Sequence, residues 1–301
     1  MKKVIAIFGV LAFTAGMAFS QHNQATTTQE GVNLEAVIEQ VGGEWNTATQ
    51  EQNGLNNILG INQSGSFNIA IQEQDSRETG AYDPDNEAYI YQSGDWNYAS
   101  QVQASSSQRN TAYIDQSGNS NQAFQDQSNQ GLNAEIDQSG DFNYAIQTQA
   151  NNAFRALINQ EGDWNSASQD QDGKRNVAEI DQLGDYNIAT QQQLASQDHP
   201  LEGKLVILQE GDWNTAAQVQ HNDEGGSYAI ITQEGDANFA GQNQYGPGPN
   251  NASITQYGDW NTATQSQTGE DLIGTIIQHS SYNIAIQTQI GAGNTASIVQ
   301  D

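Results

Sequence analysis

Residues 61–74 read INQSGSFNIAIQEQ, and this stretch defines the pattern I-x-Q-x-G-x-x-N-x-A-x-Q-x-Q. The pattern occurs in eleven full copies, the first running from Ile38 to Gln52, and a twelfth begins near the end with Ile298 and Gln300. Successive copies are mostly 22 to 24 residues apart, with two longer intervals of 27 and 29. Repetition at this period is typical of solenoids and stacked arrays, so it outweighs every other signal in the chain.

The same polar residues recur at fixed positions in every copy. The first Gln of the pattern is Gln40, Gln63, Gln92, Gln116, Gln138, Gln160, Gln182, Gln209, Gln233, Gln256 and Gln278. The motif Asn is Asn46, Asn68, Asn97, Asn121, Asn143, Asn165, Asn187, Asn214, Asn238, Asn261 and Asn283. Two more Gln follow each Asn after four and six residues, as in Gln72 and Gln74.

Each copy has two arms in which constant and variable residues alternate. The first arm reads N-x-A-x-I-x-Q, as in residues 110–116, and the second reads N-x-A-x-Q-x-Q, as in residues 143–149. A strict period of two is typical of a β-strand. The sequence therefore predicts an all-β protein, a β-solenoid of about eleven strand–turn–strand rungs in which two parallel, in-register sheets stack in a cross-β arrangement.

The two arms are joined by four residues, typically x-Gly-Asp-aromatic, which favour a tight turn. The turn glycines are Gly42, Gly65, Gly94, Gly118, Gly140, Gly162, Gly184, Gly211, Gly235 and Gly258, and the eleventh copy has Ser280 instead. The first copy has one additional turn residue, Gly43, so we expect a bulged turn there.

The constant residues of both arms are expected to face inward. An isolated buried Gln or Asn costs several kcal/mol when its amide has no partner. If identical residues stack about 4.8 Å apart, each amide can donate to the next one along the axis, as in cross-β ladders. We therefore predict that the Gln and Asn columns form stacking ladders, with Ile and Ala filling the space between them.

The composition is acidic and only moderately apolar. The chain has 301 residues, no Cys, 36 acidic and 8 basic residues, and a formal net charge of −28. This charge argues against nucleic acid as a partner. The absence of Cys means that disulfides do not stabilise the fold.

Residues 1–20 are predicted to be a secretory signal peptide. Lys2 and Lys3 precede the apolar run 4–13, and Ala18-Phe19-Ser20 has the small-x-small form of a cleavage site, with cleavage after Ala18 as an alternative. No apolar run after residue 19 is long enough for a transmembrane helix. Residues 21–33 do not match the repeat and are predicted to be a flexible segment, either a frayed terminus or an export signal, and residues 34–301 form the solenoid.

Both ends of the predicted solenoid carry the repeat pattern, and neither has a visible polar cap. An unpaired strand edge is a template for another chain. We therefore expect head-to-tail assembly through Ile38 and Gln40 at one end and Asn294, Ala296, Ile298 and Gln300 at the other.

The motif Q-x-G-x-x-N-x-A-x-x-x-Q, carried in the second copy by Gln63, Gly65, Asn68, Ala70 and Gln74, resembles the curlin repeat of curli fibre subunits. The resemblance covers residues 34–301. It implies a major-subunit-like functional amyloid of the biofilm matrix, which mediates adhesion as a fimbrium-like surface fibre. It also implies a dedicated outer-membrane export pore, passage through the periplasm and a related minor subunit that nucleates the fibre. The familiar family pattern has Ser six residues before the first Gln, where this chain often has Asn.

Three further columns each have two interpretations. The turn acids Asp141, Asp163, Asp185, Asp212, Asp236 and Asp259 are either hydrated turn residues or a row that slows assembly until cations or low pH relieve its repulsion. The aromatic residues before the motif Asn, such as Trp164, either stack between rungs or bind carbohydrate or dye. Outward apolar residues such as Ile284 and Ile286 are either scattered exposure or a surface that bundles fibres.

No enzyme, cofactor or metal site is expected. The four His residues have no ligand spacing, and no nucleophile triad or phosphate-binding loop is present in the sequence. A regular outward Thr array for binding ice is also missing. The alternative to a fibre subunit is a monomeric secreted β-solenoid adhesin, which would require blocked ends.

Overall fold

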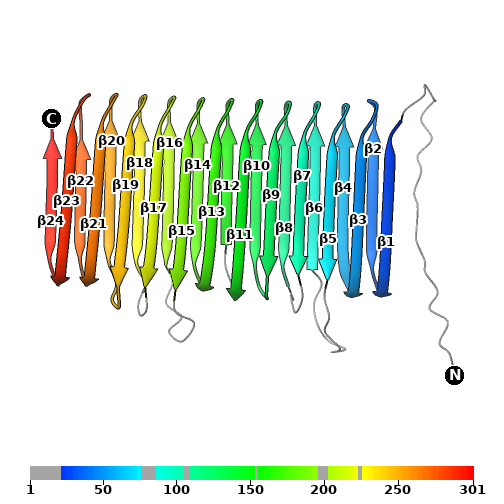
Figure 1. The fold of residues 1–301 in the computed structure, drawn as a ribbon, viewed down its shortest axis with the longest axis horizontal. Coiled ribbons are helices and arrows are strands. Elements are labelled where there is room, and N and C mark those ends of the chain that lie inside the picture. Colours follow the sequence, from blue (N-terminus) through cyan, green and yellow to red (C-terminus); the bar gives the residue numbers. More distant parts are fainter. Residues whose placement is uncertain (1–21, 76–85, 105–108, 153–154, 196–202, 223–225) are drawn as a thin grey trace.

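The computed structural model describes residues 22–75, 86–104, 109–152, 155–195, 203–222 and 226–301. In these residues every regular element is a β-strand, and consecutive strands alternate between two sheets of 12 strands each (Figure 1). Sheet A, which holds the second arms, consists of β1 (Gln24–Val32), β3 (Thr47–Leu55), β5 (Ile69–Asp75), β7 (Tyr98–Ala104), β9 (Gln122–Ser128), β11 (Tyr144–Asn152), β13 (Ser166–Lys174), β15 (Ile188–Ala195), β17 (Thr215–Asn222), β19 (Phe239–Gly246), β21 (Thr262–Glu270) and β23 (Ile284–Ala292).

Sheet B holds the first arms. It consists of β2 (Glu35–Val41), β4 (Asn57–Ser64), β6 (Asn86–Ser93), β8 (Thr111–Ser117), β10 (Asn133–Ser139), β12 (Arg155–Glu161), β14 (Val177–Leu183), β16 (Lys204–Glu210), β18 (Tyr228–Glu234), β20 (Asn251–Tyr257), β22 (Ile273–Gln278) and β24 (Thr295–Gln300).

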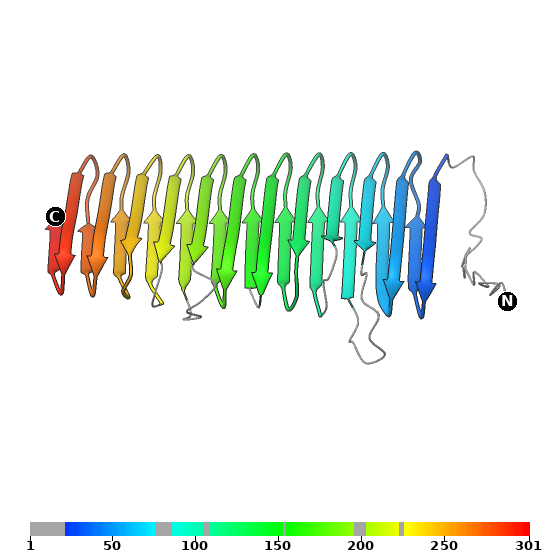
Figure 2. The same cartoon turned by 60° about the horizontal axis from the view of Figure 1, so that its bottom comes forward.

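Neighbouring strands of each sheet are parallel and in register. In sheet B, Ile136 aligns with Ile114 on one side and Ile158 on the other, and Gln138 likewise aligns with Gln116 and Gln160. Figure 2 shows the two layers, with short uniform turns at one end of every rung. The predicted fold class is thus confirmed: the protein is an all-β solenoid of two stacked parallel sheets.

The largest apolar cluster between the sheets is built from two columns of residues. Each internal rung contributes one Ile from sheet B and one Ala from sheet A, and these residues, from Ala48 and Ile61 to Ile276 and Ala285, form one continuous cluster. Ile136 and Ala145 are completely buried. Burial of each Ile side chain contributes roughly 1.5–3 kcal/mol, so the repeat supplies its hydrophobic stabilisation in small equal steps.

The prediction that residues 21–33 are unstructured is wrong for the described part of that segment. Gln24–Val32 forms β1, which pairs in register with β3 along its whole length. The physical reason is that Asn23, Ala25 and Gln29 occupy the Asn, Ala and second Gln positions of a second arm, with Thr27 in place of the first Gln. The solenoid therefore starts half a rung earlier than the sequence pattern suggested.

The turn glycines are required by contact between rungs as well as by the turn itself. Gly162 has φ +117°, and a Cβ there would lie 2.3 Å from the carbonyl oxygen of Gly184 in the next rung. In the bulged first turn, Gly43 and not Gly42 occupies this position, because its Cβ would lie 1.8 Å from the Gly65 carbonyl oxygen while that of Gly42 meets no atom. Gly42 is therefore the additional residue.

The aromatic column adopts a backbone conformation that the sequence did not reveal. Trp164 has φ +61°, and Trp45, Phe67, Trp96, Phe142, Tyr186, Trp213, Trp260 and Tyr282 are similar. Positive φ is unfavourable for bulky side chains. The conformation is held because the Trp164 N–H donates to the Asp141 carbonyl of the preceding rung, at 2.9 Å.

The predicted signal peptide at residues 1–20 lies outside the described residues. In the part of the chain that the structure describes, no helix has the length and apolar character needed to cross a membrane.

Replacing Gly162 with Ala is expected to lower the free energy of unfolding by about 1–3 kcal/mol, because the new Cβ meets a backbone carbonyl at a positive φ. Gly241→Ala is the matched control: Gly241 is not at positive φ, and a Cβ there meets only side-chain atoms, at 3.7 and 3.9 Å. Urea unfolding of both variants measures the difference. Equal midpoints would contradict the close-approach explanation.

Candidate functional site: polar ladders and sheet edges

Three unbroken ladders of side-chain amides run along the interior. In sheet B, Nε2 of each first Gln donates to Oε1 of the next, from Gln40 through Gln138 and Gln160 to Gln300, with distances of 2.8 or 2.9 Å. In sheet A, a second ladder extends from Gln29 to Gln289. A third extends from Thr27 to Gln287.

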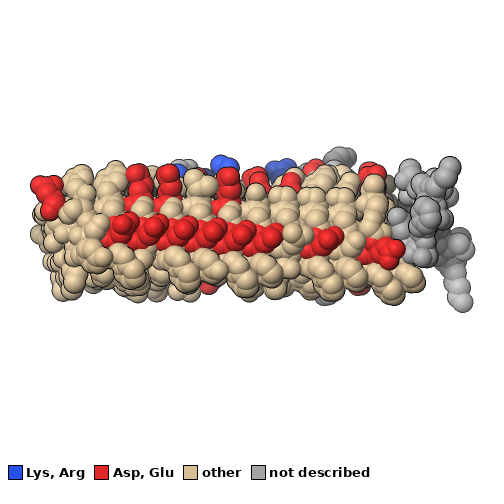
Figure 3. Space-filling view, turned by 90° about the horizontal axis from the view of Figure 1, so that it is seen from above, with Lys and Arg blue, Asp and Glu red and all other residues tan. Residues whose placement is uncertain are grey.

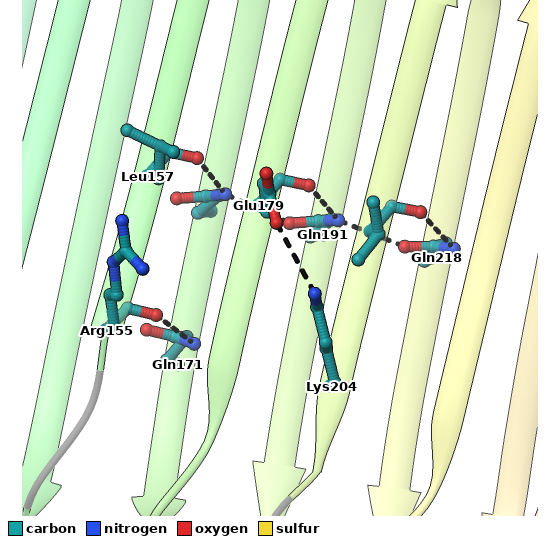
Figure 4. A network of polar contacts seen from close by, with 9 residues as sticks. Arg155, Leu157, Gln171, Glu179, Gln191, Lys204 and Gln218 are labelled. Carbon is teal, nitrogen blue, oxygen red and sulfur yellow. Dashed lines mark hydrogen bonds and ion pairs between the residues drawn. The ribbon is translucent and has the colours of Figure 1, made fainter.

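Most ladder amides are also tied to the facing sheet. The other N–H of Gln191 donates to the Glu179 carbonyl at 2.9 Å, and that of Gln171 donates to the Arg155 carbonyl at 3.4 Å (Figure 4). Gln160 in sheet B reciprocates by donating to the Tyr144 carbonyl of sheet A at 3.1 Å. These bonds join the two sheets across the core and fix which way each amide faces.

All three ladders have the same direction. Each Nε2 points toward the C-terminal end of the solenoid, where it meets the Oε1 of the following rung. At the first rung, therefore, Oε1 of Gln29 and Gln40 points outward as an acceptor. At the last rungs Gln287 and Gln300 each donate one Nε2 hydrogen to the facing sheet and keep the other for the open edge, whereas Gln289 donates both, to the Ile273 and Asn294 carbonyls.

The motif Asn residues are completely or almost completely buried in the internal rungs, but they do not form the side-chain-to-side-chain ladder that we predicted. Asn143 Oδ1 accepts the backbone N–H of Asn165, and Asn143 Nδ2 donates to the Gly162 carbonyl, at 2.9 and 2.7 Å. Asn143 Nδ2 also donates to the Ser139 carbonyl at 3.4 Å, so both N–H groups of this amide are used by backbone carbonyls and none is left for its copy. The Asn column therefore ties each turn to the backbone of the next rung.

The turn acids form a fourth column of hydrogen bonds. Oδ1 of Asp163 accepts the backbone N–H of Asp141, and Oδ1 of Asp185 accepts that of Asp163, both at 2.8 Å. Asn119 occupies the same position and accepts the N–H of Asp95 at 3.0 Å. Figure 3 shows the resulting row of acidic side chains along the turn end. Each turn carboxylate thus accepts a hydrogen bond from a backbone N–H of the preceding rung. The sequence interpretation considered only the hydration and the negative charge of these residues.

The aromatic column stacks between rungs. Phe142 and Trp164 have ring centroids 4.3 Å apart with nearly parallel planes, and Tyr186 and Trp213 are 4.2 Å apart. His22 extends the column by stacking on Trp45 at 4.1 Å. Each stacked ring covers one face of its neighbour, which favours the packing role for these pairs, while Trp96, Trp213 and Trp260 stay about 60% exposed.

The two edges of the described solenoid leave parts of the interior columns accessible. Ile38 and Ile298 are only partly buried, whereas the Ile residues of the same inward column between Ile90 and Ile276 are completely buried. Gln40, Ala296 and Gln300 are also partly exposed, and Asn294 is exposed. At the first edge β1 lies in sheet A ahead of β2, and at the last edge β24 lies in sheet B beyond β23, so the two edges are staggered in complementary ways (Figure 1).

A model of the curlin associated repeat matches residues 155–184, which cover β12, the turn at Gly162, β13 and β14. The chain therefore contains a curlin repeat. The matched curlin repeat has the same columns and the same register as the rungs on either side of it. No curated protein matches the chain.

Carboxylates on the outer faces of the curlin-repeat rungs are unevenly solvated. Burial raises the pKa of Asp137 above its ordinary value of 3.8, and neighbouring Asp115 and Glu135 raise it further. Burial also raises the pKa of Asp126 and of Asp181, although a hydrogen bond from Asn159 opposes the shift at Asp181. Lys204 contacts Glu179 at 3.5 Å, an exposed ion pair of little energetic weight (Figure 4).

Gln160→Leu is expected to destabilise the fold by about 2–5 kcal/mol. The substitution leaves an N–H of Gln138 and the Oε1 of Gln182 without partners inside the core, and each such group costs about 1–3 kcal/mol. Asn133→Leu on the exposed face of β10 is the control and should stay within about 0.5 kcal/mol of the parent. Denaturant unfolding compares them, and equal stabilities would show that the ladder is energetically neutral.

Acidification from neutral pH toward the ordinary carboxyl pKa is expected to stabilise the fold. The folded-state pKa values of Asp126, Asp137 and Asp181 are raised, so their stabilising contribution is complete below 3.8 and is lost as pH rises through the folded pKa. Asp137→Asn should raise the free energy of unfolding at pH 7, seen as a higher urea midpoint, by less than about 1 kcal/mol because the group is half exposed.

The matched control is Glu234→Gln, which removes one negative charge from an exposed side chain of the same sheet. It should change the midpoint less than Asp137→Asn does. A midpoint that rises with pH between 4 and 7 would contradict the assigned direction of the shifts.

Proposed function

We propose that this curlin-repeat protein is the structural subunit of an extracellular amyloid-type fibre, which it forms by joining end to end with copies of itself. The observation that carries the proposal is the pair of complementary open edges. Each edge presents unpaired backbone groups and part-exposed Ile, Ala and Gln columns in the register of an internal rung. Such edges favour addition of another strand with the same pattern.

The direction of the amide ladders supports a head-to-tail contact. The last rungs present Nε2 donors and the first rungs present Oε1 acceptors, so only opposite ends of two copies are complementary. In such a contact Gln300 continues the ladder to Gln40 of the next copy. A contact between two identical ends would oppose donor to donor or acceptor to acceptor.

The stagger of the edges predicts which strands meet. With internal spacing maintained, β23 of one copy pairs with β1 of the next, and β24 pairs with β2. In this arrangement β24 and β1 face each other across the core as the two arms of one rung. Ile298 then packs against Ala25 of the next copy, just as Ile and Ala pack in every internal rung.

The biological role that we propose is mechanical. A fibre of this kind would provide matrix scaffolding in a biofilm and attachment to cells and surfaces. The predicted signal peptide supports secretion, and the curlin repeat supports export through a dedicated outer-membrane pore and nucleation by a minor subunit. We propose no enzymatic activity, because the polar residues that recur in every rung are the ones that form the structural ladders.

Seeded assembly of residues 21–301 tests the proposal. Preformed fibres should shorten the lag of thioflavin fluorescence, and fibre diffraction should give a reflection near 4.7–4.8 Å. A β-rich chain that stays monomeric in the presence of seeds would contradict the proposal and favour the monomeric adhesin.

The end-to-end contact is tested by Ala25→Lys. Ala25 faces the core side of β1 but is exposed in the single chain, so Lys there is tolerated until a second copy buries its charge. An unpaired buried ammonium costs at least about 3 kcal/mol, which corresponds to roughly a 100-fold slower elongation. Thr26→Lys adds the same charge on the outer face and should elongate like the parent. Equal rates for the two variants would place β1 outside the contact.

A further inference from the structure

The outer face of sheet A divides into an acidic half and an uncharged half. Toward the N-terminal end, outward side chains include Glu51, Glu73, Asp126 and Asp170. In β15, β17, β19, β21 and β23, by contrast, none of the first four outward residues is Asp, Glu, Lys or Arg. In a chain with a formal net charge of −28, this second half is an unusual surface.

This uncharged half, hereafter the uncharged face, combines large apolar side chains with Thr, Ser, Asn and Gln, and it is uneven in height. Ile188 is 49% exposed, Phe239 42% and Ile286 71%. Gly241 has no side chain, so a shallow hollow opens over it between Phe239 and Ile286. Ridges of Ile beside a hollow of this kind are features that interdigitate when two β-sheets pack face to face, about 10 Å apart.

We propose that the uncharged face is the surface through which two copies of this chain associate side by side, each using the same face. Two copies repel each other wherever their acidic faces approach. The outer face of sheet B is unsuited to such an approach because it carries acids in many of its strands from β2 to β18, such as Glu39, Asp137 and Glu234. The uncharged face allows close approach without burying an unpaired charge. The turn acids, including Asp212 and Asp236, border it along one side and remain in water.

The area is sufficient when it is repeated along a fibre. Five strands about 4.8 Å apart and seven residues long give a face of roughly 550 Å² per copy. Two such faces bury about 1,100 Å², close to the lower limit of specific interfaces, so a single pair of chains binds weakly. Fibres present the face once in every subunit, and many weak contacts in series give strong lateral adhesion. In this respect the inference rests on the proposed fibre.

Thr264→Glu tests the proposal, and Thr49→Glu is its matched control. Thr264 lies at the second outward position of β21, and Thr49 lies at the same position of β3 in the acidic half. Both residues are half-buried and follow an outward Thr, and both have an in-register Ile as a neighbour. The two substitutions therefore add the same charge in the same local setting.

Fibres of both variants and of the parent are measured at neutral pH for elongation rate and, by cryo-electron microscopy, for the number of filaments per bundle. Thr264→Glu is expected to elongate at the parent rate but to give single filaments, whereas Thr49→Glu bundles like the parent. Bundling of Thr264→Glu equal to the parent overturns the lateral face. Loss of bundling in both variants assigns the effect to overall charge and overturns it as well.

Failure of the proposed function gives a different result, because the parent itself then forms no filaments. In that case sedimentation equilibrium of the unpolymerised chains decides the matter. Weak self-association that Thr264→Glu abolishes and Thr49→Glu retains supports the lateral face, and absence of self-association in the parent overturns it.

Discussion

The structure depends on the way in which a buried Gln amide is satisfied. A ladder amide in an internal rung uses its oxygen to accept from the preceding rung, one N–H to donate to the following rung, and, in most rungs, the other to bind a carbonyl of the facing sheet. None of these partners exists in an isolated strand–turn–strand unit. A polar core is therefore stable only when identical rungs stack on both sides in strict register, because a shift of one residue would place every ladder residue on the outer face.

This requirement explains which parts of the rung vary. The turn end is nearly invariant because a Cβ on its glycines would lie 1.8–2.5 Å from the next carbonyl oxygen over most of the solenoid. Asn and Asp side chains also bond the backbone of adjacent rungs there. At the other end the connections change in length, from 22 residues per rung to 29, while the strands they join keep their register. Loops of different length are tolerated there because they contribute little to the stack.

Much of the fold could be predicted from two patterns. The period-two alternation determines which side chains face inward, and the repeat spacing determines which residues align in neighbouring rungs. The Gln ladders follow from the same logic. The role of Asn143 and its equivalents could not be predicted, because a side chain that bonds the backbone of the next turn leaves the same pattern as one that bonds its own copy. Strand β1 was missed because Thr27 replaces a Gln, although Asn23, Ala25 and Gln29 carried the signal. The positive φ of Trp164 depends on a backbone bond between rungs and has no sequence signature.

The measurement that tests the central claim most directly is hydrogen exchange of Gln side-chain amides, followed by NMR on the assembled or monomeric solenoid. If the ladders hold the rungs together, the side-chain N–H groups of inward residues such as Gln138 and Gln160 should exchange as slowly as backbone amides of the same strands. The outward residues Gln122 and Gln192, which are exposed on sheet A, should exchange rapidly. Fast exchange at the inward positions, at rates like those of Gln122, would show that the amides are solvated and would contradict the account.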